Sequence, residues 1–145
     1  RKVLQFACSG GDNEYLPHNH VKNSVVYPGT HDNTTITAWW ESAATPKEKA
    51  TAAAYLHLTG AHPTAKEVAA VKTADARTAL LRAALGSVAD RAIIPMYDWL
   101  GLGEEAHLNT PGKLGGNWAW RAAAGFESKT LAKTIADECS VYCRV

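Results

Sequence analysis

Three short apolar runs, none of them with a regular polar alternation, predict buried strands. They cover Val3–Ala7, Ser24–Tyr27 and Ala92–Pro95. Strands of parallel sheets that are covered on both faces have this character. Residues 9–23, between the first two runs, are rich in Gly, Asn, His and Pro and predict a loop.

Two capping boxes predict helix starts between the second and third strands. The sequence TPKE at 45–48 places Thr at the N-cap, Pro at the first helical position and Glu at the third. The sequence TAKE at 64–67 repeats the pattern, and we expect Gly60 to end the first helix. Alanine is abundant from 50 to 85, so this region is predicted to be helical scaffold.

Apolar residues at helical spacing complete the pattern. Leu81 and Leu85 share one face of the alanine-rich region. A last amphipathic helix is predicted near the end of the chain by a stripe of Leu131, Ile135, Cys139 and Tyr142. Residues 96–121, before that helix, are rich in Gly, Asn and Trp and predict a long functional loop.

Composition limits the classes of function. The 145 residues suffice for one domain, and 46% hydrophobic with 20% charged residues is ordinary. A net charge of +1 gives no reason to expect nucleic acid or an acidic membrane as partner. No apolar run approaches the roughly 18 residues of a membrane span, and no signal-peptide pattern is visible. Three cysteines, an odd number, argue against a disulfide framework and fit a reducing compartment.

The most informative polar cluster follows the second predicted strand, in the stretch NSVVYPGTHDNTT. His31, Asp32 and Asn33 come directly after a Pro-Gly turn. At the end of a strand, these side chains can point into one pocket, where a carboxylate stabilises positive charge, grips hydroxyls or acts as a base. The alternative is an Asx-type turn that caps the next helix, and the spacing leaves both open.

Aromatic residues form a second group of candidates. Trp39 and Trp40 follow the His-Asp turn and are predicted to be core. Trp118 and Trp120 lie in a polar, glycine-rich segment, where a flat ring packs against a sugar or anchors the loop. Asn109, in the same loop, is suited to bind hydroxyl groups or to hold a turn.

Metal ligands and nucleophiles are weakly represented. His18 and His20 are a possible ligand pair, but a surface loop is the simpler interpretation because a third ligand at a recognised spacing is missing. Cys139 and Cys143 are four residues apart, but Cys139 lies on the apolar stripe, which favours packing. The sequence shows no Ser-His-Asp arrangement and no phosphate-binding loop. Because the possible ligand pairs have simpler interpretations, we predict no metal site.

Taken together, several segments resemble one enzyme family. The segments KVLQFA, LPHN, NSVVYPGTHDN, IIP…D.LGLG, LNTPG and GNWAWR occur here in the order found in 4-alpha-glucanotransferases. This is the amylomaltase or disproportionating-enzyme family of the alpha-amylase clan. The resemblance runs from Lys2 to about Arg121, with a looser match in the final helix.

The resemblance implies an α/β fold, the C-terminal part of a (β/α)8 TIM barrel. The three apolar runs then resemble strands six to eight, and residues 1–145 form a partial catalytic barrel domain with a helical insertion at about 45–87. The family's nucleophilic aspartate and acid/base glutamate lie on earlier strands, and their motifs are not in this sequence. The chain also begins with Arg1 rather than methionine, directly before a segment that reads as a strand from Lys2 onward. We therefore expect a piece of a longer enzyme whose N-terminal part is its partner.

The implied reaction is a retaining transfer of alpha-1,4-glucan segments between maltooligosaccharides or starch-type glucans, without a cofactor. By motif match, Asp32 stabilises the transition state together with His31. Asn33, Asn109, Trp118 and Trp120 are the implied substrate-binding residues. The chain alone is expected to be inactive. The rival interpretation is a non-catalytic carbohydrate-binding module or a decayed gene product, which the upstream open reading frame would distinguish.

The sequence departs from the family pattern at three places. Thr34 stands where the family commonly has Asp after HDN, and His107 stands where many relatives have Arg in ARMN. Many members also carry an acidic residue near Ser9. The LPHNH and YPGTHDN segments are most similar to plant, algal and cyanobacterial relatives, which predicts a plastid or a bacterial cytoplasm.

Overall fold

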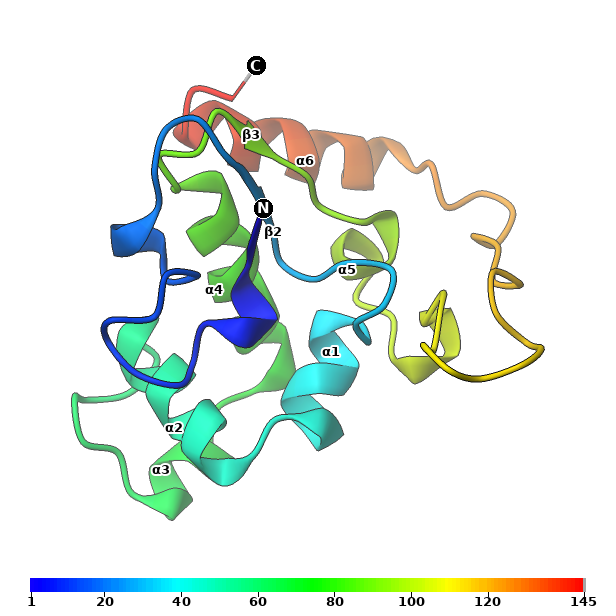
Figure 1. The fold of residues 1–145 in the computed structure, drawn as a ribbon. Helices are drawn as coiled ribbons and strands as arrows, with labels where there is room; N and C mark the ends of the chain where they lie inside the picture. Colours follow the sequence, from blue (N-terminus) through cyan, green and yellow to red (C-terminus); the bar gives the residue numbers. More distant parts are fainter. Residues whose placement is uncertain (145) are drawn as a thin grey trace.

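The computed structural model describes residues 1–144, in which three parallel strands form one sheet (Figure 1). The strands are β1 (Lys2–Val3), β2 (Val25–Tyr27) and β3 (Arg91–Ala92). β2 is central: Lys2 of β1 pairs with Val26, and Val25 pairs with Arg91 of β3. The predicted parallel sheet is confirmed.

The strands are shorter than predicted, and prolines explain where the ladders stop. The run Val3–Ala7 leaves the sheet after Val3 and forms the 3-10 turn η1 (Leu4–Phe6). The neighbouring β2 runs into Pro28, whose carbonyl still accepts from the Gln5 amide at 3.1 Å but whose nitrogen has no N–H to extend the ladder. The run Ala92–Pro95 likewise has only Ala92 in β3; Ile93 donates one more hydrogen bond to the Val26 carbonyl before the chain reaches Pro95.

Both capping boxes are confirmed in the helical region. Thr45 caps α2 (Pro46–Tyr55) with Glu48 as its partner, and the TAKE box starts α3 (Ala65–Ala69) in the same way. The other helices between β2 and β3 are α1 (Ile36–Ala38), which continues into the π-helical turn η3 (Trp39–Ala43), and α4 (Thr73–Leu85).

The expected end of α2 at Gly60 is wrong. The helix ends at Tyr55, and His57 adopts the left-handed conformation with φ of 57°. The amide of Leu58 then donates to the Ala53 carbonyl and that of His57 to Ala54, which is the hydrogen-bond pattern of a Schellman motif. Histidine thus takes the position at which we expected glycine.

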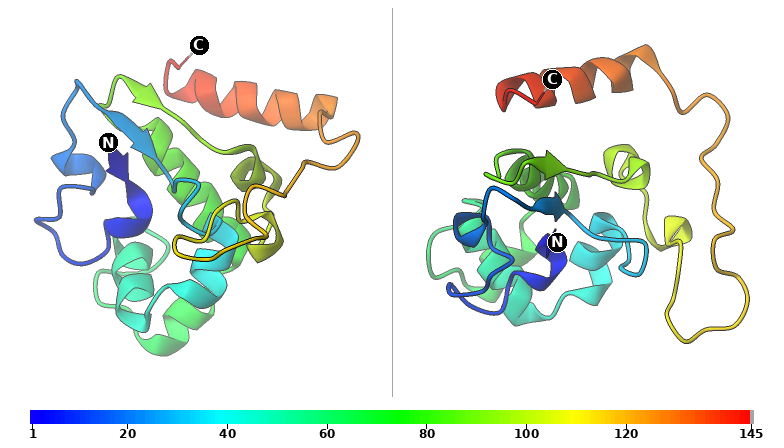
Figure 2. Two further views of the ribbon diagram at one scale, coloured as in Figure 1. Left: turned by 45° about the vertical axis from the view of Figure 1, so that its right-hand side comes forward. Right: turned by 45° about the horizontal axis from the view of Figure 1, so that its top comes forward.

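The predicted loop at 96–121 is partly helical. It begins with α5 (Met96–Leu100), and the 3-10 turn η4 (Glu104–Ala106) follows. Gly101 ends α5 with φ of 70°, and an added Cβ there would lie 1.8 Å from a guanidinium nitrogen of Arg77. From residue 107 to 128 the chain is irregular and bows away from the body, as Figure 2 shows in yellow and orange.

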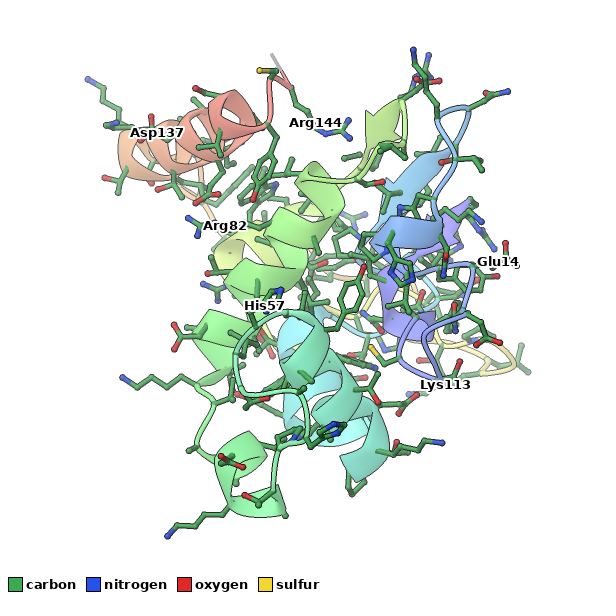
Figure 3. The ribbon with its side chains drawn as sticks, turned by 90° about the vertical axis from the view of Figure 1, so that its left-hand side faces the viewer. Glu14, His57, Arg82, Lys113, Asp137 and Arg144 are labelled. Carbon is green, nitrogen blue, oxygen red and sulfur yellow. The ribbon has the colours of Figure 1, made fainter. Side chains whose placement is uncertain are left out.

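The last predicted helix is present as α6 (Lys129–Val141), and its stripe is half-buried. Hydrogen bonds from two arginines, Arg82 and Arg144, connect the α6 region to α4 and the segment after it (Figure 3). Arg82 of α4 binds both carboxylate oxygens of Glu138, and Arg144 donates to the carbonyls of Leu85, Ser87 and Ala89.

The core lies between the sheet and the helices that follow β2. Val26 and Ile36 are fully buried, and the predictions of buried Trp39 and Trp40 are confirmed. Leu81 and Leu85 of α4 are buried as expected from their shared face. This packing fixes the carboxyl ends of the strands, where the polar loops begin.

Candidate active site

The polar cluster predicted from the sequence lies at the carboxyl end of the central strand. After Tyr27 the chain turns through Pro28 and Gly29, beside Gln5 from the neighbouring strand exit. An added Cβ on Gly29 would lie 2.5 Å from the Gln5 side-chain nitrogen, so a larger residue there would displace that amide. The Gln5 amide also donates to the Thr34 carbonyl at 2.7 Å. The Gln5 backbone N–H donates to the Pro28 carbonyl at 3.1 Å, so Gln5 holds both ends of the turn that carries His31 and Asp32.

The turn is closed internally by Asn33. Its side-chain oxygen accepts hydrogen bonds from the backbone N–H and the hydroxyl of Thr30, each at 2.9 Å. Because that oxygen is engaged in the turn, a substrate contact from Asn33 would have to use its amide nitrogen.

Asp32 does not cap the next helix. The N-terminus of α1 is capped by the Thr35 hydroxyl, which accepts from the Ala38 amide at 3.2 Å, and by Asp98, which accepts from the Ile36 amide at 2.9 Å. The Asp32 side chain is 47% exposed. The alternative of a capping aspartate at position 32 is therefore not supported, and its carboxylate faces the solvent side of the loops.

Asp32 is held by residues from two segments. Its Oδ1 lies 2.5 Å from the side-chain nitrogen of Asn109 and 3.3 Å from Nε2 of His31. The Asn109 backbone N–H donates to the His31 carbonyl at 3.0 Å, which locks the two segments together. Both of these side-chain contacts are made by Oδ1, so within residues 1–144 Oδ2 stays available to a ligand.

A pocket of about 390 Å³ lies next to this turn, and His31, the neighbour of Asp32, is part of its lining. Its lining includes Tyr27, Thr30, His31, Tyr97 and Trp118. The His31 and Trp118 rings have their centroids 4.9 Å apart at 41°. The pocket thus combines polar side chains with flat aromatic faces, the combination that binds a sugar ring.

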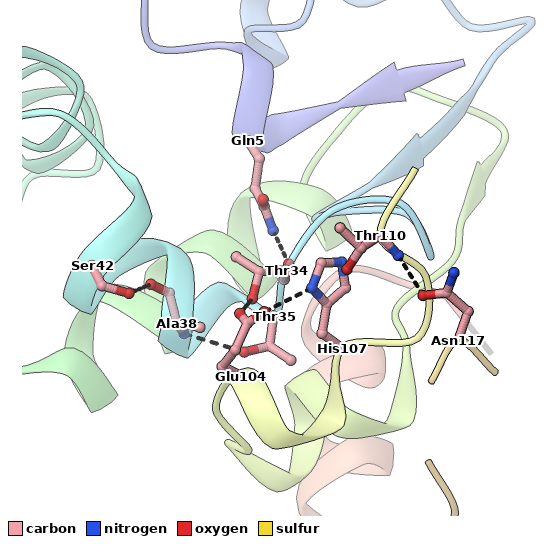
Figure 4. Close-up of polar contacts among 9 residues, drawn as sticks. All are labelled: Gln5, Thr34, Thr35, Ala38, Ser42, Glu104, His107, Thr110 and Asn117. Carbon is pink, nitrogen blue, oxygen red and sulfur yellow. Dashed lines mark hydrogen bonds and ion pairs between the residues drawn. The ribbon is translucent and has the colours of Figure 1, made fainter. Parts of the chain in front are cut away.

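Trp118 and Trp120 occupy different positions. Trp118 is 53% exposed, has φ of 60°, and donates its amide to the Leu108 carbonyl at 2.6 Å. Trp120 is outside the pocket lining and packs its ring at 80° on Tyr97, with centroids 6.0 Å apart. Trp118 therefore reaches the pocket directly, whereas Trp120 reaches it through Tyr97. The loop that joins Asn109 to Trp118 is held by Asn117, whose side-chain oxygen accepts from the Thr110 amide (Figure 4).

Asp98, which lies in the IIP…D.LGLG segment, was not among the predicted site residues. Asp98 is 1% exposed, and this burial raises its pKa to about 7, although the Ile36 hydrogen bond and the positive charge of Arg77 oppose the rise. Its role as the cap of a helix 62 residues earlier depends on tertiary packing. Asp98 therefore supports the turn from beneath rather than facing a ligand.

The two histidines weighed as metal ligands have separate partners. His18 is exposed and lies against Tyr55, with Nδ1 3.0 Å from the tyrosine hydroxyl. His20 is buried between the Ser87 hydroxyl and the Tyr15 carbonyl, and this burial lowers its pKa. In the described part of the chain, no three His, Cys, Asp or Glu side chains gather as a metal site. In residues 1–144 no helix has the length and apolarity to cross a membrane.

A carboxylate and aromatic side chains at the carboxyl ends of parallel strands are arranged as at the active-site face of a (β/α)8 barrel. The family model for 4-alpha-glucanotransferase matches residues 1–127. The chain belongs to this 4-alpha-glucanotransferase family.

Curated relatives agree with this assignment. The chloroplastic/amyloplastic 4-alpha-glucanotransferase of Arabidopsis thaliana is 43% identical over 99% of this chain and 23% of its own length. The enzyme of Clostridium butyricum is 38% identical over 99% of this chain and 27% of its own. The enzyme of Thermus thermophilus is 46% identical over 86% of this chain and 24% of its own length. The chain thus spans about a quarter of the length of these relatives.

A solved structure gives the same result. The amylomaltase from Streptococcus agalactiae in complex with acarbose superposes with a TM-score of 0.81 at 27% identity, over 99% of this chain and 27% of that one. The predicted fold class, part of a (β/α)8 barrel, is confirmed. The assignment of the strands as sixth to eighth and of a helical insertion at about 45–87 stays a prediction.

Proposed function

We propose that this chain is the part of a 4-alpha-glucanotransferase that supplies the transition-state carboxylate to the glucan site. The enzyme would transfer alpha-1,4-linked segments between maltooligosaccharides with retention of configuration. The observation that carries the proposal is the half-exposed Asp32, held by Asn109 and His31 at the edge of an aromatic pocket. Family membership favours this over a non-catalytic binding module.

Asp32 would act through its charge. The transition state of glycosyl transfer resembles an oxocarbenium ion, so a fixed carboxylate stabilises it more than the neutral substrate. The Asn109 amide and His31 fix the carboxylate before substrate arrives, which avoids reorganisation during the reaction. Trp118 would pack against a sugar ring, and Asn33 and Trp120 would contribute at the margin of the same site.

The remaining catalytic groups would come from another part of the protein. A retaining transfer needs a nucleophilic carboxylate and a second carboxyl group as acid and base. In the part of the chain that the structure describes, the pocket lining contains neither Asp nor Glu. We infer that an N-terminal segment of the same enzyme supplies both. The plant relatives are chloroplastic or amyloplastic and others are bacterial, which supports a plastid or a bacterial cytoplasm for this protein.

The test is disproportionation of maltotriose by the full-length protein that contains this chain. We expect glucose and longer oligosaccharides, and we expect Asp32→Asn to abolish most of this turnover. Asp12→Asn, a matched change of an exposed loop carboxylate, should retain full activity. Binding of maltooligosaccharides without any new product would instead support the binding-module alternative.

A further inference from the structure

Glu104 joins the two segments that meet at Asp32 (Figure 4). Its Oε2 accepts a hydrogen bond from the Thr34 hydroxyl, 70 residues earlier. Its Oε1 lies 2.9 Å from Nδ1 of His107, which donates when that nitrogen carries the proton. Burial alone would raise the pKa of Glu104, but the hydrogen bonds from Thr34 and His107 outweigh it and hold the pKa below its ordinary value. The carboxylate is therefore a charged link between the β2 exit loop and the segment after η4.

The same two segments meet again closer to the reacting group. Asn109 binds the His31 carbonyl through its backbone and the Asp32 carboxylate through its side chain. Thr34 lies two residues after Asp32, and His107 lies two residues before Asn109. The Glu104 contacts thus form an outer pair of links, and the Asn109 contacts form an inner pair.

The Asn109 contacts need a further link between the two segments, because the side chains they hold are only partly packed. The side chains of His31 and Asp32 are each 47% exposed. By contrast, the His107 side chain is 13% exposed, and the Thr34 carbonyl is also held by the buried Gln5, so both partners of Glu104 are anchored although the Glu104 side chain is itself 68% exposed. The outer links are therefore anchored at Thr34 and His107.

The outer links use both positions at which this chain departs from the common family pattern around the site, Thr34 and His107. One carboxylate satisfies both side chains. Glu104 thus explains how a threonine and a histidine are accommodated together at these two positions.

We propose that Glu104 is a positioning residue for Asp32, holding the β2 exit loop against the Asn109 segment so that the carboxylate keeps its place at the pocket. The catalytic consequence rests on the proposed function, whereas the structural link does not. Displacing a catalytic group by a fraction of an ångström lowers the reaction rate far more than losing a surface contact does, because the rate depends on how the reacting groups are placed.

The first test is kinetic, with the full-length protein and maltotriose. We expect Glu104→Gln to lower kcat by about 10- to 100-fold with little change in KM, because Asp32 acts on the transition state. Thr34→Val, which removes the hydroxyl at nearly constant shape, should lower kcat in the same direction. The double variant should be no worse than Glu104→Gln alone, since both changes break one contact. The matched control is Glu105→Gln, whose carboxylate binds only the nearby Gly103 amide, and its kcat should be unchanged.

The second test does not depend on activity. In hydrogen–deuterium exchange of the full-length protein, Glu104→Gln and Thr34→Val should each speed exchange of the peptide that contains the Asn109 amide, and Glu105→Gln should not. Unchanged exchange and unchanged kcat in both variants would overturn the proposal, as would an effect of Glu104→Gln on KM alone, which indicates direct substrate contact. If the wild-type protein makes no transfer products, the proposed function fails, and the exchange data still decide whether Glu104 positions the loop.

Discussion

The side-chain amide of Asn109 lies 2.5 Å from the carboxylate of Asp32, 77 residues earlier in the chain. This contact joins two loops that leave different elements, and it places an uncharged donor against the carboxylate at the edge of the pocket. An amide suits this place because it donates to the carboxylate without neutralising its charge.

Changing Asn109 in the full-length enzyme should therefore reveal how Asp32 is held. Asn109→Asp would place two carboxylates in contact, so the Asp32 side chain should be driven away, and kcat should fall further than in Asn109→Leu. We expect a loss of about 10²-fold for Asn109→Asp from misplacement of the catalytic group. The measurement is steady-state transfer from maltotriose. Equal losses in the two variants would show that charge repulsion at Asp32 does not matter.

Asp32→Asn in the full-length enzyme should lower kcat by roughly 10² to 10³ with a small effect on KM. The reason is that, under the proposed function, the carboxylate would interact mainly with the cationic transition state. His31→Ala should lower kcat by less, because His31 only flanks the carboxylate at 3.3 Å. Initial rates over a range of maltotriose concentrations separate the two constants. A change confined to KM would indicate uniform binding of substrate and transition state.

The 145-residue chain by itself should not transfer glucose units. In the described residues the pocket lining contains no Asp or Glu, and Asp32 lies beside it next to His31. Retaining transfer requires two further carboxyl groups in attacking and proton-transferring positions. Chromatographic analysis of maltotriose incubations checks this. Disproportionation above a heat-treated control would mean that the catalytic groups lie within these residues.

The same isolated chain should associate in solution. β1 and β3 each pair on one side only, and Phe6 and Ile93, next to these strands, are 52% and 47% exposed. Unpaired strand edges beside apolar side chains favour intermolecular contact. We expect helical far-UV circular dichroism with broad, early elution in size-exclusion chromatography. A monodisperse monomer that melts cooperatively would be the contrary result and would indicate an autonomous domain.

Asp98 should make stability fall as the pH rises towards neutrality. Its folded-state pKa of about 7 lies above the ordinary value of 3.8, so the native state binds a proton that the unfolded state has released. The stabilisation is complete below pH 3.8 and is lost as the pH rises through 7. Asp98→Asn keeps an acceptor for the Ile36 amide but carries no charge. The melting temperature of this variant relative to wild type should therefore increase from pH 5 to pH 8, and a constant difference would contradict the assignment.

Local signals in the sequence predicted several features correctly. Both capping boxes, at Thr45 and at Thr64, need only residues within one turn, so their sequence pattern suffices. The half-buried stripe of α6 follows from helical periodicity in the same way. The His-Asp turn was also visible, because a strand followed by Pro-Gly and polar residues is a local pattern.

The residues that complete the site depended on the tertiary structure. Asn109 next to Asp32, Asp98 beneath α1 and Glu104 beside Thr34 each join residues more than 60 positions apart. Sequence spacing carries no information on such contacts. The ends of the strands were also missed, because a ladder stops where its neighbour lacks an N–H, as at Pro28. The sequence by itself thus determined which chemical groups are present and which turns and helix starts form. Only the packing of the sheet and helices decided which of those groups meet, because hydrogen bonds between distant segments require both partners to be fixed in space.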